Sequence, residues 1–166
     1  ERGVLGLPVL LAFQTLRWKQ NGIFEIGFAP NSSNTRKSNV CFEGAQPIIE
    51  AEFGHSKINM FLDTGAIRTR ALPLFVREFA DFVNESGRKD RTQVTGVGGS
   101  VEVDAITLTE LALRISGFSV GLRPAQVLLK ETTSDSRWWH IWLGLDLLNQ
   151  ARVVTIDFKS MTLTLE

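Results

Sequence analysis

The sequence has very few residues that bind metals or form disulfides. Among its 166 residues are one cysteine, Cys41, and two histidines, His55 and His140. A single cysteine cannot close an intramolecular disulfide, and one cysteine with two histidines cannot build the usual Cys/His zinc site. The sequence therefore predicts neither a bound metal nor another cofactor.

An excess of one charge and a long apolar run are also missing. Eighteen Lys and Arg balance eighteen Asp and Glu, and no block of five like charges occurs. Nucleic acids and anionic membranes attract clustered positive charge, so neither is an expected partner. The longest apolar run near the N-terminus, residues 4–13, contains Gly6 and Pro8 and is shorter than the roughly 20 residues that cross a bilayer. No membrane segment is expected in this chain.

The length and composition indicate one domain with one core. A domain typically has about 150 residues, and 43% hydrophobic residues is close to the globular average. Residues 29–39 (APNSSNTRKSN) are polar and lack hydrophobic periodicity, as in a flexible linker. We therefore divide the chain into a strand-rich tail (1–28), a linker (29–45) and a lobe (46–166).

Hydrophobic periodicity predicts that the lobe is mainly β, with one or two helices. Apolar residues alternate in two strands within 47–62, and the period of two returns from residue 93 onward. Between these regions, residues 72–84 have apolar side chains at helical spacing. They predict one amphipathic helix that starts with Pro73 in its first turn and stops at Gly87.

A short repeat relates the two ends of the chain. Residues 4–10 read VLGLPVL and residues 142–148 read WLGLDLL, with four identical positions at a fixed offset of 138. Each copy precedes a predicted pair of strands around a polar turn. One interpretation is coincidence in leucine-rich sequence. The other is duplication, in which the chain opens with the end of a preceding lobe and carries one complete repeat from about Val40.

The segment with the clearest chemical meaning is 63–69, DTGAIRT, which directly follows the apolar strand 59–62. Asp63 can supply a carboxylate, Thr64 a hydroxyl, and Gly65 a backbone N–H that approaches the carboxylate closely. An Asx-type turn between a strand and a helix would use the same residues. An apolar strand that runs into Asp-Thr-Gly-Ala also resembles the active-site loop of aspartic proteases.

Three further features strengthen this resemblance. Thr69 occupies the hydroxyl position that follows the loop in retroviral-type proteases. Residues 96–100 (GVGGS) resemble a glycine-tipped flap hairpin, and residues 141–148 (IWLGLDLL) resemble the strand and short helix that pass beneath the loop. With these features in this order, the chain resembles the retropepsin family and its bacterial single-lobed relatives.

The resemblance covers about residues 46–166 and implies a fold, an activity and a location. The fold would be a closed, barrel-like β lobe with one or two helices. The activity would be hydrolysis of peptide bonds by a water activated between two aspartates, which share one proton because like charges about 3 Å apart cannot both ionise. An extracytoplasmic location is slightly favoured.

The resemblance also implies roles for particular residues. These are catalysis for Asp63, support of the catalytic loop for Thr64, Gly65 and Thr69, and contact with a polypeptide substrate for Ala66, Gly98 and Gly99.

Some residues depart from the family pattern. Ile67, Arg68 and Arg70 interrupt a stretch that is usually small or polar and then apolar. A cation within about 6 Å of the catalytic carboxylate would favour the fully ionised, inactive pair. The chain has no tyrosine, so a flap tyrosine of the pepsin type is excluded.

Of the seven aspartates, only Asp63 lies in such a loop, so one chain supplies one carboxylate. Asp146 falls in a helical segment and is interpreted as a structural hydrogen-bonding residue. Activity then requires a second lobe, either a second copy on a twofold axis or a tandem lobe in a longer polypeptide. The alternative is a catalytically silent lobe that binds peptides or dimerises, and Arg68 and Arg70 favour it.

Other candidate residues have simpler interpretations. Residues 117–121 match the GxSxG pattern, but a hydrolase nucleophile elbow needs a helix directly after it, and the surrounding periodicity predicts antiparallel strands. His55 is expected in an exposed turn, and His140 is expected to be a satisfied core histidine. Three tryptophans fit either core packing or an apolar substrate pocket: Trp138, Trp139 and Trp142.

Overall fold

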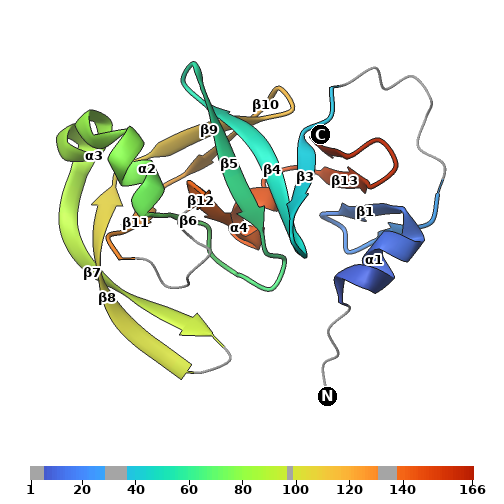
Figure 1. Cartoon of the computed structure of the whole chain (residues 1–166), viewed down its shortest axis with the longest axis horizontal. Helices are drawn as coiled ribbons and strands as arrows, with labels where there is room; N and C mark the ends of the chain where they lie inside the picture. The colour runs from blue at the N-terminus through green and yellow to red at the C-terminus, as the bar shows by residue number, and fades with distance from the viewer. Residues whose placement is uncertain (1–5, 29–36, 97–98, 131–137) are drawn as a thin grey trace.

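The structure is a computed structural model that describes residues 6–28, 37–96, 99–130 and 138–166. The described residues form two β-sheets and four helices, so the protein is mainly β, as expected (Figure 1). In chain order the elements are α1 (Leu7–Phe13), β1 (Thr15–Lys19), β2 (Phe24–Ile26), β3 (Val40–Glu43), β4 (Gln46–Phe53), β5 (Ser56–Leu62), β6 (Arg70–Ala71), α2 (Pro73–Glu78), α3 (Ala80–Ser86), β7 (Gly87–Gly96), β8 (Gly99–Leu108), β9 (Leu111–Ile115), β10 (Phe118–Leu122), β11 (Ala125–Leu128), β12 (Ile141–Leu143), α4 (Leu145–Leu148), β13 (Val153–Asp157) and β14 (Thr162–Leu165).

The larger sheet is curled into a half-barrel. Its strands follow the order β10-β9-β4-β5-β12-β6-β11-β8-β7, with β3 paired to β4 beside this path. The prediction of a closed barrel is therefore wrong, because β10 and β7 are the two ends of an open path among the described strands. Strand β7 carries mostly exposed polar residues, which suit an unpaired edge.

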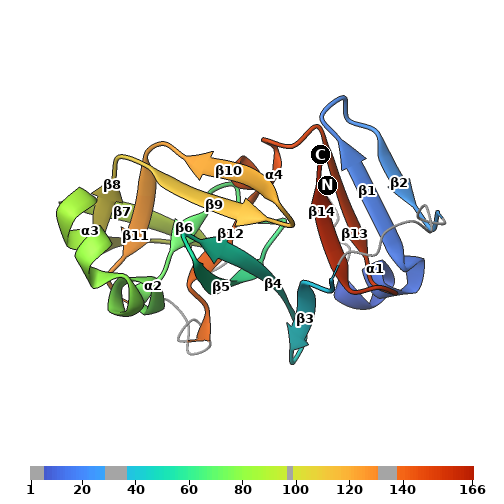
Figure 2. The same ribbon diagram turned by 90° about the horizontal axis from the view of Figure 1, so that it is seen from above.

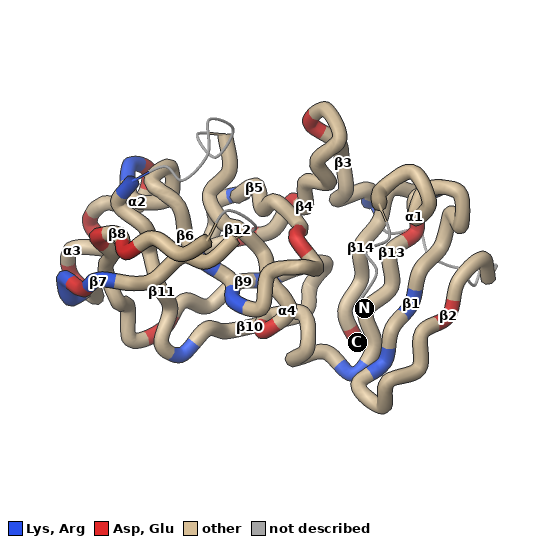
Figure 3. Tube along the Cα trace, turned by 90° about the horizontal axis from the view of Figure 1, so that it is seen from below, with Lys and Arg blue, Asp and Glu red and all other residues tan. Residues whose placement is uncertain are grey.

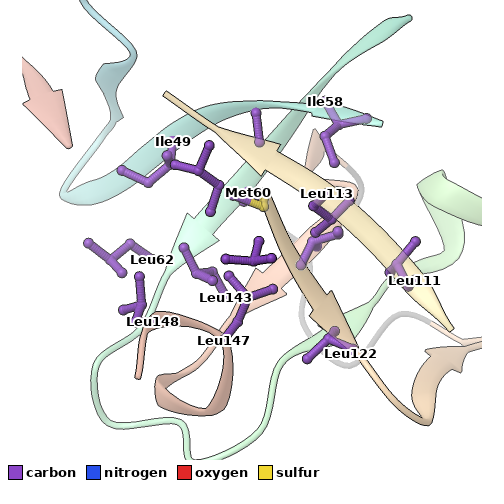
Figure 4. Packing of buried hydrophobic residues seen from close by; sticks show 14 of the residues in the cluster. Ile49, Ile58, Met60, Leu62, Leu111, Leu113, Leu122, Leu143, Leu147 and Leu148 are labelled. Atoms are coloured by element: carbon purple, nitrogen blue, oxygen red, sulfur yellow. The ribbon is translucent and has the colours of Figure 1, made fainter. Parts of the chain in front are cut away.

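The core lies on the concave side of this sheet (Figure 4). Alternate residues of β4 and β5 point into it, so the two strands and the turn between them agree with the predicted pattern. Leu143 of β12 and Leu147 and Leu148 of α4 are fully buried against them. Burying such a side chain contributes roughly 1.5–3 kcal/mol, so α4 is held mainly by its packing.

Strand β12 passes beneath the loop that joins β5 to β6. It runs parallel to β5, with Trp142 opposite Phe61, and antiparallel to β6 on its other side. The loop (63–69) therefore crosses over the end of β12 at Gly144. A Cβ atom on Gly144 would lie 2.7 Å from the backbone carbon of Arg68 and 2.8 Å from the carbonyl oxygen of Ala66. Only glycine allows the two backbone segments to approach this closely.

Residues 72–84 form two short helices, α2 and α3, and the prediction of a single helix is wrong. The helical conformation breaks at Phe79 (φ −123°, ψ 40°). The Phe79 ring packs 4.8 Å from the rings of both Phe53 and Phe75, and this tertiary packing compensates for the broken helix. The end signals are correct: Pro73 lies in the first turn of α2, and Gly87 follows the last residue of α3.

The alternating residues after residue 93 belong to a long hairpin. Strands β7 and β8 pair in register from Gly87–Leu108 to Gly96–Gly99, and the hairpin projects away from the rest of the sheet (Figure 1). Residues 101–108 form one continuous strand. Gly98, expected at the tip, lies outside the described residues.

A second sheet joins the two ends of the chain. Its order is β14-β13-β1-β2, and β1 pairs with β13 across its middle (Figure 2). The predicted pair of strands after each copy of the repeat is present, but the leucine-rich run before the first pair is the helix α1. Part of the expected linker is also structured, because residues 40–43 form β3.

Basic and acidic positions are interspersed along both sheets (Figure 3). In the part of the chain that the structure describes, no helix is long and apolar enough to cross a membrane.

We expect Gly144→Ala to lower the free energy of unfolding by about 2–3 kcal/mol, as overpacking in a core does. The contacting atoms belong to the backbone, so they cannot rotate away. Urea or guanidinium denaturation measures the change. Gly121→Ala is the matched control, because its Cβ would lie 3.5 Å from a flexible Glu110 carboxylate, and we expect a change below about 0.5 kcal/mol. Equal losses in the two variants would contradict the close-approach explanation.

Candidate active site around Asp63

Asp63 lies at the point where β5 ends and the loop begins. Its backbone N–H donates to the carbonyl of Leu143 in β12 (3.0 Å). Its carboxylate Oδ1 accepts the Gly65 N–H (2.8 Å), and Oδ2 accepts the indole N–H of Trp142 (3.0 Å). Two donors on two different segments thus fix the orientation of one half-buried carboxylate. The Asp63–Gly65 hydrogen bond is the contact that the Asp-Thr-Gly pattern predicts.

Thr69 ties this loop to the segment that passes beneath it. Its side chain is buried (4% exposed), and its hydroxyl accepts the Gly144 N–H (2.9 Å) and donates to Oδ1 of Asp146 (2.6 Å). The Thr69 N–H donates to the same carboxylate oxygen (2.8 Å). Asp146 is therefore a structural hydrogen-bonding residue, as its place in the helical segment indicates.

The other residues of the loop face outward. Thr64 and Gly65 are exposed, and with Asp63 they line an apolar cavity of about 720 Å³ that also borders α1 and the four-stranded sheet. Within the described chain the Thr64 hydroxyl makes no hydrogen bond. The loop therefore presents one carboxylate and one free hydroxyl side by side at the edge of a cavity.

A second cavity, which we call the cleft, lies between the loop and the β7–β8 hairpin. It has a volume of about 760 Å³, and its lining includes Asp63, Gly65 and Ala66 on one side and residues 93–96 of β7 on the other. Gly99 lies at the far end of the hairpin, where it pairs with Gly96 and has a positive φ of 115°. A glycine is the natural residue for this backbone conformation. The candidate substrate-contacting residues Ala66 and Gly99 thus lie on the two elements that enclose the cleft.

Arg68 and Arg70 also line the cleft, but neither forms an ion pair with Asp63. Arg68 is exposed. Arg70 donates through Nη2 to the backbone carbonyl of Gln93 (3.0 Å) and so connects β6 to the hairpin. Burial, together with the nearby Arg68 charge, lowers the pKa of Arg70, and Asp146 acts in the opposite direction. Among the charged residues that line the cleft, two are cations and one is an anion.

The remaining candidates have structural roles. The His140 ring is buried, with Nδ1 accepting the Asn59 N–H (3.0 Å) and Nε2 paired to Glu78 (2.9 Å). His55 lies in the turn between β4 and β5. Ser119 of the GxSxG match lies in the middle of β10, antiparallel to β9, so no nucleophile elbow forms there. No group of three potential metal ligands occurs among the described residues.

Sequence reasoning missed the role of Trp142. Core packing and pocket lining were its expected roles; the indole does line the cleft, but its hydrogen bond to the Asp63 carboxylate was not expected. Trp139 does pack in the core, where its ring stacks on Phe61 at 4.5 Å, and Trp138 is 55% exposed. The available signal was position: Trp142 directly precedes the Leu-Gly pair that runs beneath the loop.

The chain matches no protein-family model, and no curated protein matches it significantly.

We expect Thr69→Val to lower the free energy of unfolding by about 1–3 kcal/mol, because it leaves the buried Gly144 N–H without its acceptor. Thr69→Ser keeps the hydroxyl, so its loss should be clearly smaller. Denaturant titration of both variants measures the difference. If Thr69→Ser destabilises as much as Thr69→Val, keeping the hydroxyl gives no advantage, and the hydrogen-bond explanation is contradicted.

Proposed function

We propose that this chain is one catalytic lobe of a retropepsin-like aspartic endopeptidase, with Asp63 as one of two carboxylates that activate a water. The observation that carries the proposal is the setting of Asp63. Its carboxylate follows a buried strand, accepts the N–H of the glycine two residues later, and opens onto a cleft covered by a hairpin with glycines at its far end. The passage of β12 under the same loop gives further support.

The proposed reaction needs a second carboxylate within about 3 Å of Asp63. Two carboxylates at this distance hold one proton between them and titrate as a pair. The ionised member takes a proton from the water, whose oxygen attacks the peptide carbonyl, while the protonated member donates to the carbonyl oxygen. Collapse of the tetrahedral intermediate breaks the C–N bond. The leaving nitrogen receives the proton that the first carboxylate took from the water, and the other carboxylate recovers its proton from a hydroxyl of the intermediate.

The exposed residues around Asp63 suit an approach by a second lobe. Thr64 offers a free hydroxyl beside the carboxylate, and the adjoining apolar cavity borders the loop on one side. A symmetric partner loop would bring its own Asp-Thr-Gly to the same place, where the two threonines can exchange hydrogen bonds. Gly65 leaves room for this approach because it has no side chain.

The second candidate function is a silent lobe that binds peptides without cleaving them. The observation that favours it is the pair of cations in the cleft with Asp63. Arg70 is already bonded to the hairpin, so Arg68 is the cation available to a bound peptide. In either function the cleft should prefer peptides with acidic side chains.

We expect Asp63→Asn to abolish cleavage of an unfolded protein, with a loss of about 100-fold or more, because the amide cannot act as the proton acceptor. Cleavage should be followed from acid to neutral pH, with the 166-residue chain over a range of concentrations and with the natural polypeptide that contains it. Asp104→Asn, an exposed aspartate of the hairpin, is the matched control and should retain activity. Peptide binding without Asp63-dependent cleavage in both forms would favour the silent lobe.

We expect Arg68→Gln to weaken binding of glutamate-containing peptides by about two- to fivefold, the range of an exposed ion pair. The same peptides with glutamine in place of glutamate should bind equally well to both proteins. Fluorescence anisotropy with the Asp63→Asn protein measures affinity without cleavage. Arg88→Gln, on the hairpin but outside the cleft lining, is the control. A loss of affinity that is the same for both peptides would exclude a charge contact.

A further inference from the structure

Two parts of the chain have the same local architecture. Residues 6–28 form a glycine, a helix and a hairpin (Gly6, α1, β1, β2), and residues 144–165 repeat this order (Gly144, α4, β13, β14). We call the first the N-terminal unit and the second the C-terminal unit. The two glycines both precede their helix in an extended conformation, and they are 138 positions apart, the offset of the sequence repeat.

The pairing of β1 with β13 makes the two units symmetric. We call two residues counterparts when they are 138 positions apart, the offset of the repeat. Arg17 pairs with Thr155, which is its counterpart. On either side, Leu16 pairs with Ile156, the counterpart of Trp18, and Trp18 pairs with Val154, the counterpart of Leu16. This register, with the sheet order β14-β13-β1-β2 shown in Figure 2, is that of a local twofold axis between Arg17 and Thr155.

The two units differ in what covers them. In the C-terminal unit, Leu147 and Leu148 of α4 are fully buried, and every residue of β14 is buried. In the N-terminal unit, α1 has no buried residue, and both apolar residues of β2 are exposed, Phe24 by 54% and Ile26 by 45%. The C-terminal unit is packed against the half-barrel, and the N-terminal unit lacks an equivalent partner among the described residues.

The surroundings of Gly144 and Gly6 differ in the same way as the burial of their units. Backbone atoms of Ala66 and Arg68 lie within 3 Å of a Cβ built on Gly144, because the catalytic loop crosses there. Around Gly6 the nearest atom is a side-chain carbon of Pro8 at 3.7 Å, in its own unit. No described residue therefore occupies the position where a second Asp-Thr-Gly loop would cross. The apolar cavity of about 720 Å³ borders this position, between Leu7 and Leu10 on one side and Asp63 on the other.

We propose that the exposed face of the N-terminal unit is the docking surface of a second lobe of the same kind, which precedes this one in the natural polypeptide. Residues 6–28 are then the terminal helix and hairpin of that lobe, and its loop crosses over Gly6 as 63–69 crosses over Gly144. The inference rests on the repeat and on the difference in burial between the two units. It also rests on the proposed function, which it deepens by naming the source of the second carboxylate.

A second copy of this chain fits the surface less well. In a twofold pair of identical lobes, β13 of one copy would pair with β13 of the other. Here β13 is already bonded on both sides, by β14 and by β1. A second copy would have to displace residues 15–19, and the exposed apolar residues of α1 and β2 would still lack a cover.

The experiment compares this 166-residue chain with the natural polypeptide, both carrying Asp63→Asn so that the readout is independent of catalysis. Hydrogen–deuterium exchange followed by mass spectrometry should show amides of α1 and β2 exchanging about 100-fold more slowly in the natural polypeptide, as when an exposed element joins a packed core. The residues before Glu1 should contain their own Asp-Thr-Gly or equivalent loop.

A matched pair of variants tests the surface itself. Phe24→Asp should remove most of the protection of α1 and β2 in the natural polypeptide, whereas Val101→Asp, an equally exposed apolar residue of β8, should not. The proposal is overturned if the natural polypeptide begins near Glu1 or if α1 stays unprotected in it. It is also overturned if the 166-residue chain is a dimer in solution with α1 and β2 protected, since the occupant is then a second copy. Docking without cleavage would leave the surface assigned and reject only the proposed function.

Discussion

The crossing of two backbone segments at Gly144 is the constraint on which the rest of the structure depends. The loop that carries Asp63 passes over β12 at a distance that admits no Cβ atom, and Thr69 and Asp146 bond the two segments together on the far side. This crossing places β12 between β5 and β6, and it positions the Trp142 indole to donate to Asp63. The loop that carries Asp63 is thus held by contacts with the segment that packs into the core.

The same crossing explains why the two ends of the chain resemble each other. After Gly144 the chain turns into a short helix and a hairpin, and the segment after Gly6 does the same. In the first case the helix buries leucines in the half-barrel, and in the second the helix has no buried residue. Five of the nine exposed large apolar residues in the described part of the chain lie in the N-terminal unit, and the proposed docking surface rests on this clustering.

Much of the fold was predictable because it depends on local patterns. Alternation of apolar residues gave β4, β5 and the final hairpin, and Gly87 and Pro73 marked helix ends that the structure contains. The break at Phe79 was not predictable, because the helical spacing continues through it and only the tertiary contacts with Phe53 and Phe75 favour the change. The open edge of the half-barrel was missed for a similar reason, since closure depends on strands far apart in sequence.

The sequence by itself determined which residues could do chemistry: one aspartate followed by Thr-Gly, one hydroxyl four residues after the glycine, and no metal-binding cluster. These features are residue types and short spacings, so they can be recognised without knowing the tertiary structure. Only the tertiary structure decided what surrounds the aspartate. The indole of Trp142 lies 79 positions from Asp63 in the sequence, and the N-terminal unit pairs with β13 over 138 positions. Contacts at such separations depend on the whole packed core, and no local pattern specifies them.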